Sequence, residues 1–177
     1  DKITFNTYLG FDYMSYIESD RKQIGGSSTY EKSIYKDANR WGNALLSAVW
    51  ERNLSESRKM VSTYYVSDGY YSALYENVDK YLDYKSYSLE SNISNILDIG
   101  AKLHFSDKTF SRHYLNYGAS AVYHLFSPIA YDHSYVEIDK GRSNEKQSTY
   151  GRHYNSPEID LWAEDEFTLT PRLYLNA

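Results

Sequence analysis

Apolar and polar side chains alternate along most of this chain with a period of two residues. In the first segment Ile3, Phe5, Leu9 and Phe11 fall on one side of an extended chain, and mostly polar residues lie between them. Because successive side chains of a strand point to opposite faces, this pattern predicts a ribbon with one apolar and one polar face. An ordinary strand has about 5–6 residues, and the pattern continues well past this length. It is long enough for a tilted membrane strand, which needs about 9–11 residues.

The same alternation returns in later segments. It is clear over 91–105, 115–125 and 159–169, and a partial strand begins at Arg172. The segment WGNALLSAVWERNL (41–54) also fits a helix, but its neighbours favour a strand. The segment 59–71 predicts a strand whose faces the pattern does not assign, with a weak preference for Val61, Thr63 and Tyr65 outward, toward lipid. We therefore predict an all-β fold: an antiparallel up-and-down meander of about seven long strands.

The predicted connections alternate between long and short. Long polar loops are expected over 19–40, 79–85 and 127–157, after the first, third and fifth strands, and the turns between them are a few residues each. Outer-membrane barrels have short periplasmic turns and long extracellular loops. The rhythm thus predicts an open segment of a transmembrane β-barrel, with the first strand rising from the periplasm and the segment 132–153 accessible from outside the cell.

The apolar sides of the predicted strands form a candidate lipid-facing set. This set consists of Ile3, Phe5, Leu9, Phe11, Leu46, Trp50, Ile93, Leu97, Ile99, Leu103, Leu115, Ala119, Tyr123, Leu161 and Phe167. The opposite side of the last long strand carries Glu158, Asp160, Glu164 and Glu166, an acidic row that a dry core would not accept unpaired. A wet lumen, or a plug filling it, is the expected environment of that row.

Composition narrows the function classes. The chain has 21 Tyr among its 177 residues, and strands and membrane interfaces both favour this side chain. It has no Cys, which excludes disulfides, thiolate metal sites and thiol nucleophiles. Its net charge of −5 argues against binding nucleic acid. No apolar run approaches the about 20 residues of a membrane-spanning helix.

Three segments, read in order, resemble consecutive wall strands of TonB-dependent outer-membrane receptors. They are NRWGNALLSAVWERNLSESRKMVSTYY, HYLNYGASAVYHLFSP and EIDLWAEDEFTLTPRLYLN, and YLGFDYMSY resembles the strand before them. The resemblance covers essentially the whole chain, so 1–177 is interpreted as a partial receptor barrel domain whose two ends are cuts. It implies a parent with about 22 strands, a plug domain and a segment that contacts the TonB energy coupler.

No motif points to catalysis. Glu164 and Asp165 are neighbours on one strand, so they point to opposite faces and cannot share a substrate as paired carboxylates do. The five His residues are scattered, and we predict no metal site, no cofactor and no enzyme activity. His124 is expected at the lumen or the rim. Candidate ligand-contacting residues are placed in an outer loop: Tyr131, Asp132, His133, Tyr135 and Tyr150.

The favoured function is wall and loops of a receptor for TonB-coupled import of a nutrient in a Gram-negative outer membrane. Its expected partners are membrane lipid, the rest of the barrel with its plug, the energy coupler through other regions, and a surface lipoprotein. Two alternatives stay open. One is a soluble or surface-exposed β-rich binding domain, and the other is an outer-membrane barrel without transport, such as an adhesin or a secretion component.

Overall fold

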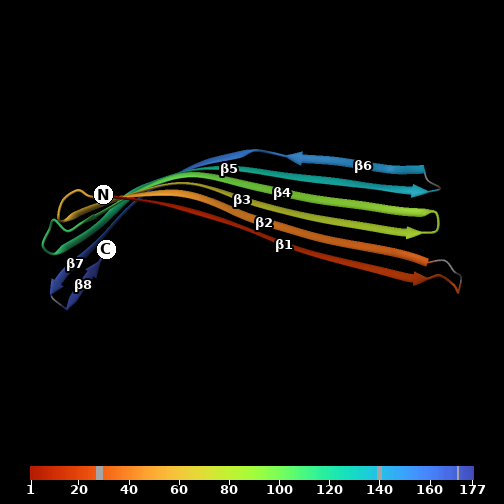
Figure 1. The fold of residues 1–177 in the computed structure, drawn as a ribbon, viewed down its shortest axis with the longest axis horizontal. Coiled ribbons are helices and arrows are strands. Elements are labelled where there is room, and N and C mark those ends of the chain that lie inside the picture. Colours follow the sequence, from red (N-terminus) through yellow and green to blue (C-terminus); the bar gives the residue numbers. More distant parts are fainter. Residues whose placement is uncertain (27–29, 139–140, 171) are drawn as a thin grey trace.

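A computed structural model describes residues 1–26, 30–138, 141–170 and 172–177. Its strands form one antiparallel sheet (Figure 1). They are β1 (Lys2–Gln23), β2 (Tyr30–Asn53), β3 (Arg58–Tyr81), β4 (Tyr84–Asp107), β5 (His113–Ile138), β6 (Gly141–Gly151), β7 (Tyr154–Thr170) and β8 (Leu173–Asn176).

The sheet is an up-and-down meander. The strand order is β1-β2-β3-β4-β5-β7-β8, and β6 also pairs with β5. β7 pairs with the first half of β5 and β6 with the second half, so β6 and β7 lie end to end along one edge of β5. The sheet is therefore seven strands wide, which confirms the predicted meander of about seven long strands. The segment 41–54, which also fitted a helix, lies almost wholly in β2.

Pro128 lies at the break between β6 and β7. In an antiparallel ladder the N–H and C=O of one residue point to the same neighbour. The carbonyl of Pro128 accepts a hydrogen bond from the backbone N–H of Arg152 (3.3 Å). The nitrogen of Pro128, which carries no proton, therefore also faces the edge of β5 where β6 and β7 lie. Because proline has no N–H to continue the ladder, the edge strand leaves the sheet at Arg152 and His153.

The predicted long loops are wrong. β1 to β5 are 22 to 26 residues long, and they contain most of 19–40, 79–85 and the first part of 127–157. The connection between β3 and β4 is only Leu82–Asp83. A segment that is polar on both sides is expected to have solvent on both sides. A loop meets this condition, but so does a strand of a hairpin that projects into solvent. The abundant Tyr of these segments favours the strand.

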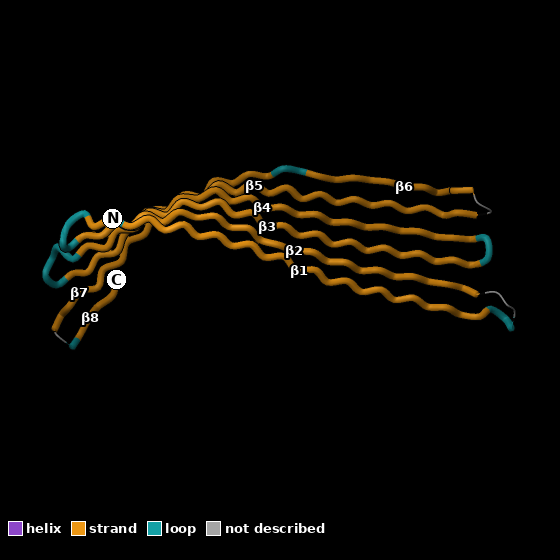
Figure 2. Tube along the Cα trace, in the orientation of Figure 1, coloured by secondary structure: helices purple, strands orange, loops and turns teal. Residues whose placement is uncertain are grey.

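The sheet is a single layer without a core. Figure 2 shows a long, gently curved part that leads to the β1–β2, β3–β4 and β5–β6 hairpin ends, and a sharp bend near the other end. The buried apolar residues of the described chain are only Ala38, Ala73 and Tyr135. Within the described residues, no helix is long and apolar enough to cross a bilayer. A lone sheet must bury its apolar face against something else, so the environment of this face decides the function.

Candidate functional site

Strand register places the predicted lipid-facing residues on one side of the sheet. Directly paired residues of neighbouring strands project to the same face, so one row of pairs links all the strands. One such row runs through Thr7, Leu46, Val66, Ile99 and Tyr123. Following these rows, every member of the predicted lipid-facing set lies on this side, which we call the apolar face. Their contact with lipid stays a prediction.

The apolar face is open to its surroundings. Phe5 is 75% exposed, Ile159 is 75% exposed and Leu161 is 81% exposed. Large contiguous apolar surfaces of this kind mark contacts with a partner or a membrane. The face also carries a groove of about 600 Å³, which is lined by Phe5, Leu46, Val66, Ile99, Tyr123 and Ile159, among others.

The weak preference for the faces of β3 is wrong. Tyr64 and Val66 lie on the apolar face, because they pair with Ala48 and Leu46, whereas Val61, Thr63 and Tyr65 lie on the other side. Both sides of β3 mix aromatic, hydroxyl and small side chains, so its own pattern carries little information. The register with β2 and β4 fixes the faces instead.

The apolar band crosses the strands obliquely. On β1 its exposed side chains extend as far as Ile17, which pairs with Lys36 of β2. On β7 they begin at Leu169, beyond the row of Ile3, and reach only to Ile159. Strands of a closed barrel tilt relative to its axis, and a horizontal membrane would cut tilted strands in this oblique manner.

Charged and aromatic side chains mark both margins of the band. Toward the hairpin ends, the Arg40 guanidinium lies over the Tyr13 ring (5.3 Å), and Lys36 Nζ lies 3.8 Å from Glu76 Oε2. Toward the short turns, the Arg52 guanidinium lies over the Trp50 ring (5.9 Å) and 3.9 Å from Asp1 Oδ1. The apolar zone thus covers only part of each long strand.

A clamp of polar groups holds the two turns at the short-turn end. The Arg58 Nε donates to Asp107 Oδ2 (2.7 Å), and the Thr109 hydroxyl and backbone N–H donate to Asp107 Oδ1. The bonds from Thr109 first, and then those from the Arg58 guanidinium, lower the pKa of the Asp107 carboxyl. Because Arg58 and Asp107 are paired across β3 and β4, the clamp fixes the register of these strands beyond the apolar band.

Asp68 is a charged residue on the apolar face. It pairs with Leu97, and its Oδ1 accepts a hydrogen bond from the Asn95 side-chain amide (2.6 Å). The sequence pattern did not identify Asp68, because the faces of its strand could not be assigned. The two polar side chains thus supply each other's hydrogen bond, and neither has another side-chain partner in the described chain.

The opposite side, which we call the polar face, carries a chain of ionisable groups across β4, β5 and β7. His124 Nδ1 lies 2.8 Å from Asp98 Oδ1, and His124 Nε2 lies 3.6 Å from Glu158 Oε2. On the neighbouring row the Ser120 hydroxyl donates to Asp160 Oδ2 (3.0 Å). These groups need water or polar partners. The wet lumen or rim expected for His124 and the acidic row stays a prediction.

Glycines on the polar face make room for aromatic rings. Gly118 pairs with Trp162, and an added Cβ would collide with the Leu103 backbone oxygen and the Trp162 indole. The indole in turn stacks on His104 (centroids 6.3 Å apart) and lies under the Lys102 ammonium (4.9 Å). The close approach of ring to backbone thus explains a glycine in the middle of a long strand.

The candidate ligand-contacting residues lie in strands, so their assignment to a loop is wrong. Tyr131, Asp132, His133 and Tyr135 belong to β5, and Tyr150 belongs to β6. Tyr131, His133 and Tyr135 are on the apolar side beyond the band, where the Tyr135 ring stacks on Tyr87 (5.0 Å).

Asp132 and Tyr150 project to the polar face instead. Asp132 accepts a hydrogen bond from Ser148 (3.3 Å), and Tyr150 pairs with Ala130. The five candidates therefore do not converge on one site. The alternation of neighbours such as Asp132 and His133 would have shown this, had the segment been interpreted as a strand. Among the described residues, no group of His, Asp and Glu is arranged to hold a metal ion.

Comparisons with known proteins give no family. No family model matches the chain, and no curated protein does. Among solved structures, a KdgM porin in complex with disordered oligogalacturonate is 5% identical, with 81% of this chain and 98% of that chain covered, at a TM-score of 0.15. A pore forming protein is 6% identical over 86% and 91% of the two chains, at a TM-score of 0.13. These scores are too low to support an argument.

Proposed function

We propose that this chain is a wall segment of a Gram-negative outer-membrane β-barrel. The observation that carries the proposal is the continuous, exposed apolar face on a coreless meander, opposite a face that bears ionisable groups. In a barrel wall the apolar face meets lipid and the polar face meets a wet lumen or a plug. Remaining strands of the same barrel would pair with the free edges of β1 and of β6, β7 and β8, which end the sheet.

The oblique band and its margins support the same proposal. The apolar zone is about as long as a membrane strand requires, and each long strand continues beyond it as a polar hairpin. Tyr13 with Arg40 lies at the margin toward the hairpin ends, where amphipathic rings and long cations suit a headgroup region. In this arrangement the hairpins project outside the cell, and an acyl chain fills the groove of about 600 Å³ on the apolar face.

Within that class we propose a TonB-dependent receptor that imports a nutrient. The support is the resemblance of three ordered wall-strand segments, beginning with NRWGNALLSAVWERNL. The plug, the contact with the energy coupler and any lipoprotein lid would belong to other parts of the assembly. An adhesin or secretion barrel would share the wall, and dependence of uptake on an intact energy coupler separates these two functions.

A second candidate is a soluble or surface-exposed β-rich binding domain. The hollow of the apolar face favours it, since a groove of this volume can hold a covering segment or an apolar ligand. In that case water, not lipid, surrounds whatever covers the face.

A nitroxide scan along β4 tests the membrane proposal. The chain has no Cys, so single-Cys variants of the full-length protein, with any Cys outside this chain replaced, can be spin-labelled at 95–103 after reconstitution in vesicles. Labels at odd positions such as Leu97 should be accessible to oxygen, which concentrates in lipid. Labels at even positions such as Asp98 should be accessible to a water-soluble nickel chelate. Equal access of the chelate to both sets would refute a membrane wall and favour the second candidate.

A further inference from the structure

A second groove lies on the polar face, where the neighbour of β5 changes from β7 to β6. Its volume is about 510 Å³, and its lining includes Tyr71, Asn92, Phe126, Tyr150, Arg152 and Tyr154. It lies at the level of the Ile93–Ile129 pair, at the hairpin-side margin of the apolar band. The sequence did not predict this site. Of its lining residues, only Tyr150 was among the candidate ligand-contacting residues.

The groove has a floor of small residues and a rim of rings. Ser94 and Pro128 pair across β4 and β5, and Ala130 follows Pro128 on the same face. Around this floor stand Tyr71 from β3, Phe126 from β5, and Tyr150 and Tyr154 from the two edge strands. The break in the edge ladder opposite Pro128 brings Tyr150 and Tyr154 to the two sides of the Arg152–His153 connection.

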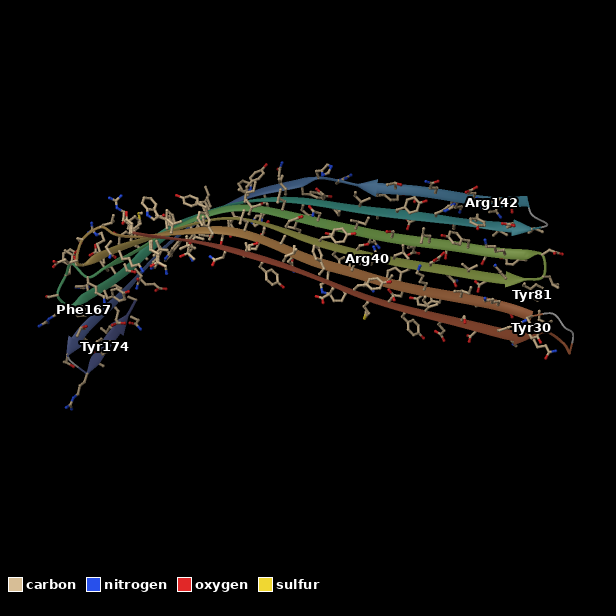
Figure 3. All side chains as sticks on the ribbon, in the orientation of Figure 1. Tyr30, Arg40, Tyr81, Arg142, Phe167 and Tyr174 are labelled. Atoms are coloured by element: carbon tan, nitrogen blue, oxygen red, sulfur yellow. The ribbon has the colours of Figure 1, made fainter. Side chains whose placement is uncertain are left out.

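The rim rings are available to a ligand. Tyr150 is 66% exposed, Tyr154 is 50% exposed and Tyr71 is 43% exposed. Tyr154 stacks on Phe126 with its centroid 6.1 Å away, which steadies one wall of the groove. Figure 3 shows the side chains of the whole sheet standing out from a single layer. Rings held this way present flat apolar surface at a low cost in side-chain entropy.

Polar groups complete the lining. In the described part of the chain, the Asn92 amide and the Arg152 guanidinium have no side-chain hydrogen-bond or ion-pair partner. The next row of the polar face carries Glu90 paired with Asp132, two carboxylates beside the groove. One guanidinium beside two carboxylates does not suit a polyanion such as a nucleotide, and free amide and guanidinium donors do not suit a purely apolar ligand.

We propose that this groove binds a short, uncharged oligosaccharide. The C–H faces of sugar rings stack on Tyr150, Tyr154 and Tyr71, and their hydroxyls exchange hydrogen bonds with the Asn92 amide, the Ser94 hydroxyl and the Arg152 guanidinium. The volume falls within the about 300–1,000 Å³ typical of small-ligand sites. The inference rests on the proposed function, because only in a barrel does the polar face line the lumen through which a nutrient passes.

Binding to the purified full-length receptor in detergent tests the inference. Isothermal titration would use maltohexaose, cellohexaose, xylohexaose, mannohexaose and laminarihexaose as probes. At least one should bind, and Tyr150→Ala, Tyr154→Ala and Arg152→Ala should each weaken that binding about tenfold. Tyr16→Ala is the matched control, since Tyr16 is an exposed ring on the polar face of β1, far from the groove; it should leave the affinity unchanged.

Two outcomes overturn the inference: a folded receptor that binds none of these sugars, or groove variants that bind as tightly as the wild type. Heat-dependent mobility on gels and β-type circular dichroism, measured on every variant, show whether the barrel has folded. A folded, membrane-inserted receptor without sugar binding refutes this inference alone. A chain that never inserts refutes the proposed function, whether or not it binds sugar.

Discussion

At the scale of single residues, neighbours in sequence have opposite environments. Leu97 projects to the apolar face, whereas Asp98 projects to the polar face and contacts His124. A charged side chain should therefore lower the stability of the folded protein much more at one of these positions than at the next. The argument applies along every strand that crosses the proposed membrane.

Leu97→Arg tests this difference. An Arg on the lipid face near the middle of a bilayer costs about 2–4 kcal/mol. Ser67→Arg is the matched control, because Ser67 lies on the polar face and pairs with Asp98. Denaturant unfolding of the full-length protein in lipid vesicles should show the full loss for Leu97→Arg and little change for Ser67→Arg. If the control is the more destabilised of the two, the faces are inverted.

Much of the residue-level pattern could be predicted from the sequence. Strict alternation in β1, β4 and β5 was sufficient to assign Phe5, Ile99 and Ala119 to one side, and the register joins them on one face. It failed for β3, where Tyr64 and Tyr65 are equally plausible on either side. The Asp68–Asn95 pair was missed for the same reason, since only the pairing of β3 with β4 brings it together.

At the scale of elements, close packing of rings on glycines holds the strands in register. The Trp162 indole and the Leu103 carbonyl oxygen both occupy the space that a Cβ at position 118 would take. Gly118→Ala should destabilise the folded protein by about 1–3 kcal/mol, as overpacking does. Gly141→Ala is the control, because its Cβ would meet only the Ile138 oxygen at 3.4 Å. Equal unfolding midpoints for the two variants would show that the indole is not fixed over Gly118.

The turn clamp at Asp107 gives a pH dependence. Its pKa is lowered in the folded protein by Thr109 and Arg58. A lowered pKa means that the ionised carboxyl stabilises the fold above its unfolded pKa of about 3.9, and this contribution is lost as the pH falls through the lower folded value. Wild type should therefore exceed Asp107→Asn in stability at pH 6, and the gap should narrow below about pH 4. Unfolding midpoints measured from pH 6 to pH 3 check this; a gap that stays constant would exclude ionisation of Asp107 as its cause.

The lengths of the elements were the least predictable feature. Polar, Tyr-rich segments such as 30–40 and 127–138 looked like loops, because they lack an apolar face. Hydrogen bonds along the ladder and contacts such as the Tyr87–Tyr135 stack keep them extended beyond the apolar zone. The groove at Pro128 could not be predicted either, since it depends on which strands meet at the β6–β7 break.

At the scale of the whole molecule, the sheet has two distinct ends. The hairpin end carries long polar extensions, and the other end carries the short turns Leu54–Ser57 and Lys108–Arg112 close to the apolar band (Figure 1). Seven strand positions alone would be too few to close a barrel with a plugged lumen, so the proposal requires further strands on both edges. In the proposed membrane, the hairpin end lies outside the cell and the short turns lie in the periplasm.

Cysteine labelling of intact cells tests this arrangement most directly. Asp83→Cys places a thiol in the β3–β4 turn, and Glu56→Cys places one in the β2–β3 turn, on a chain that has no other Cys. The full-length protein carrying either change, with any Cys outside this chain replaced, is treated with a membrane-impermeant maleimide. The Asp83→Cys variant should react on intact cells, and the Glu56→Cys variant only after the outer membrane is permeabilised. Labelling of both on intact cells, or the reverse order, would contradict a sheet that spans the outer membrane in this orientation.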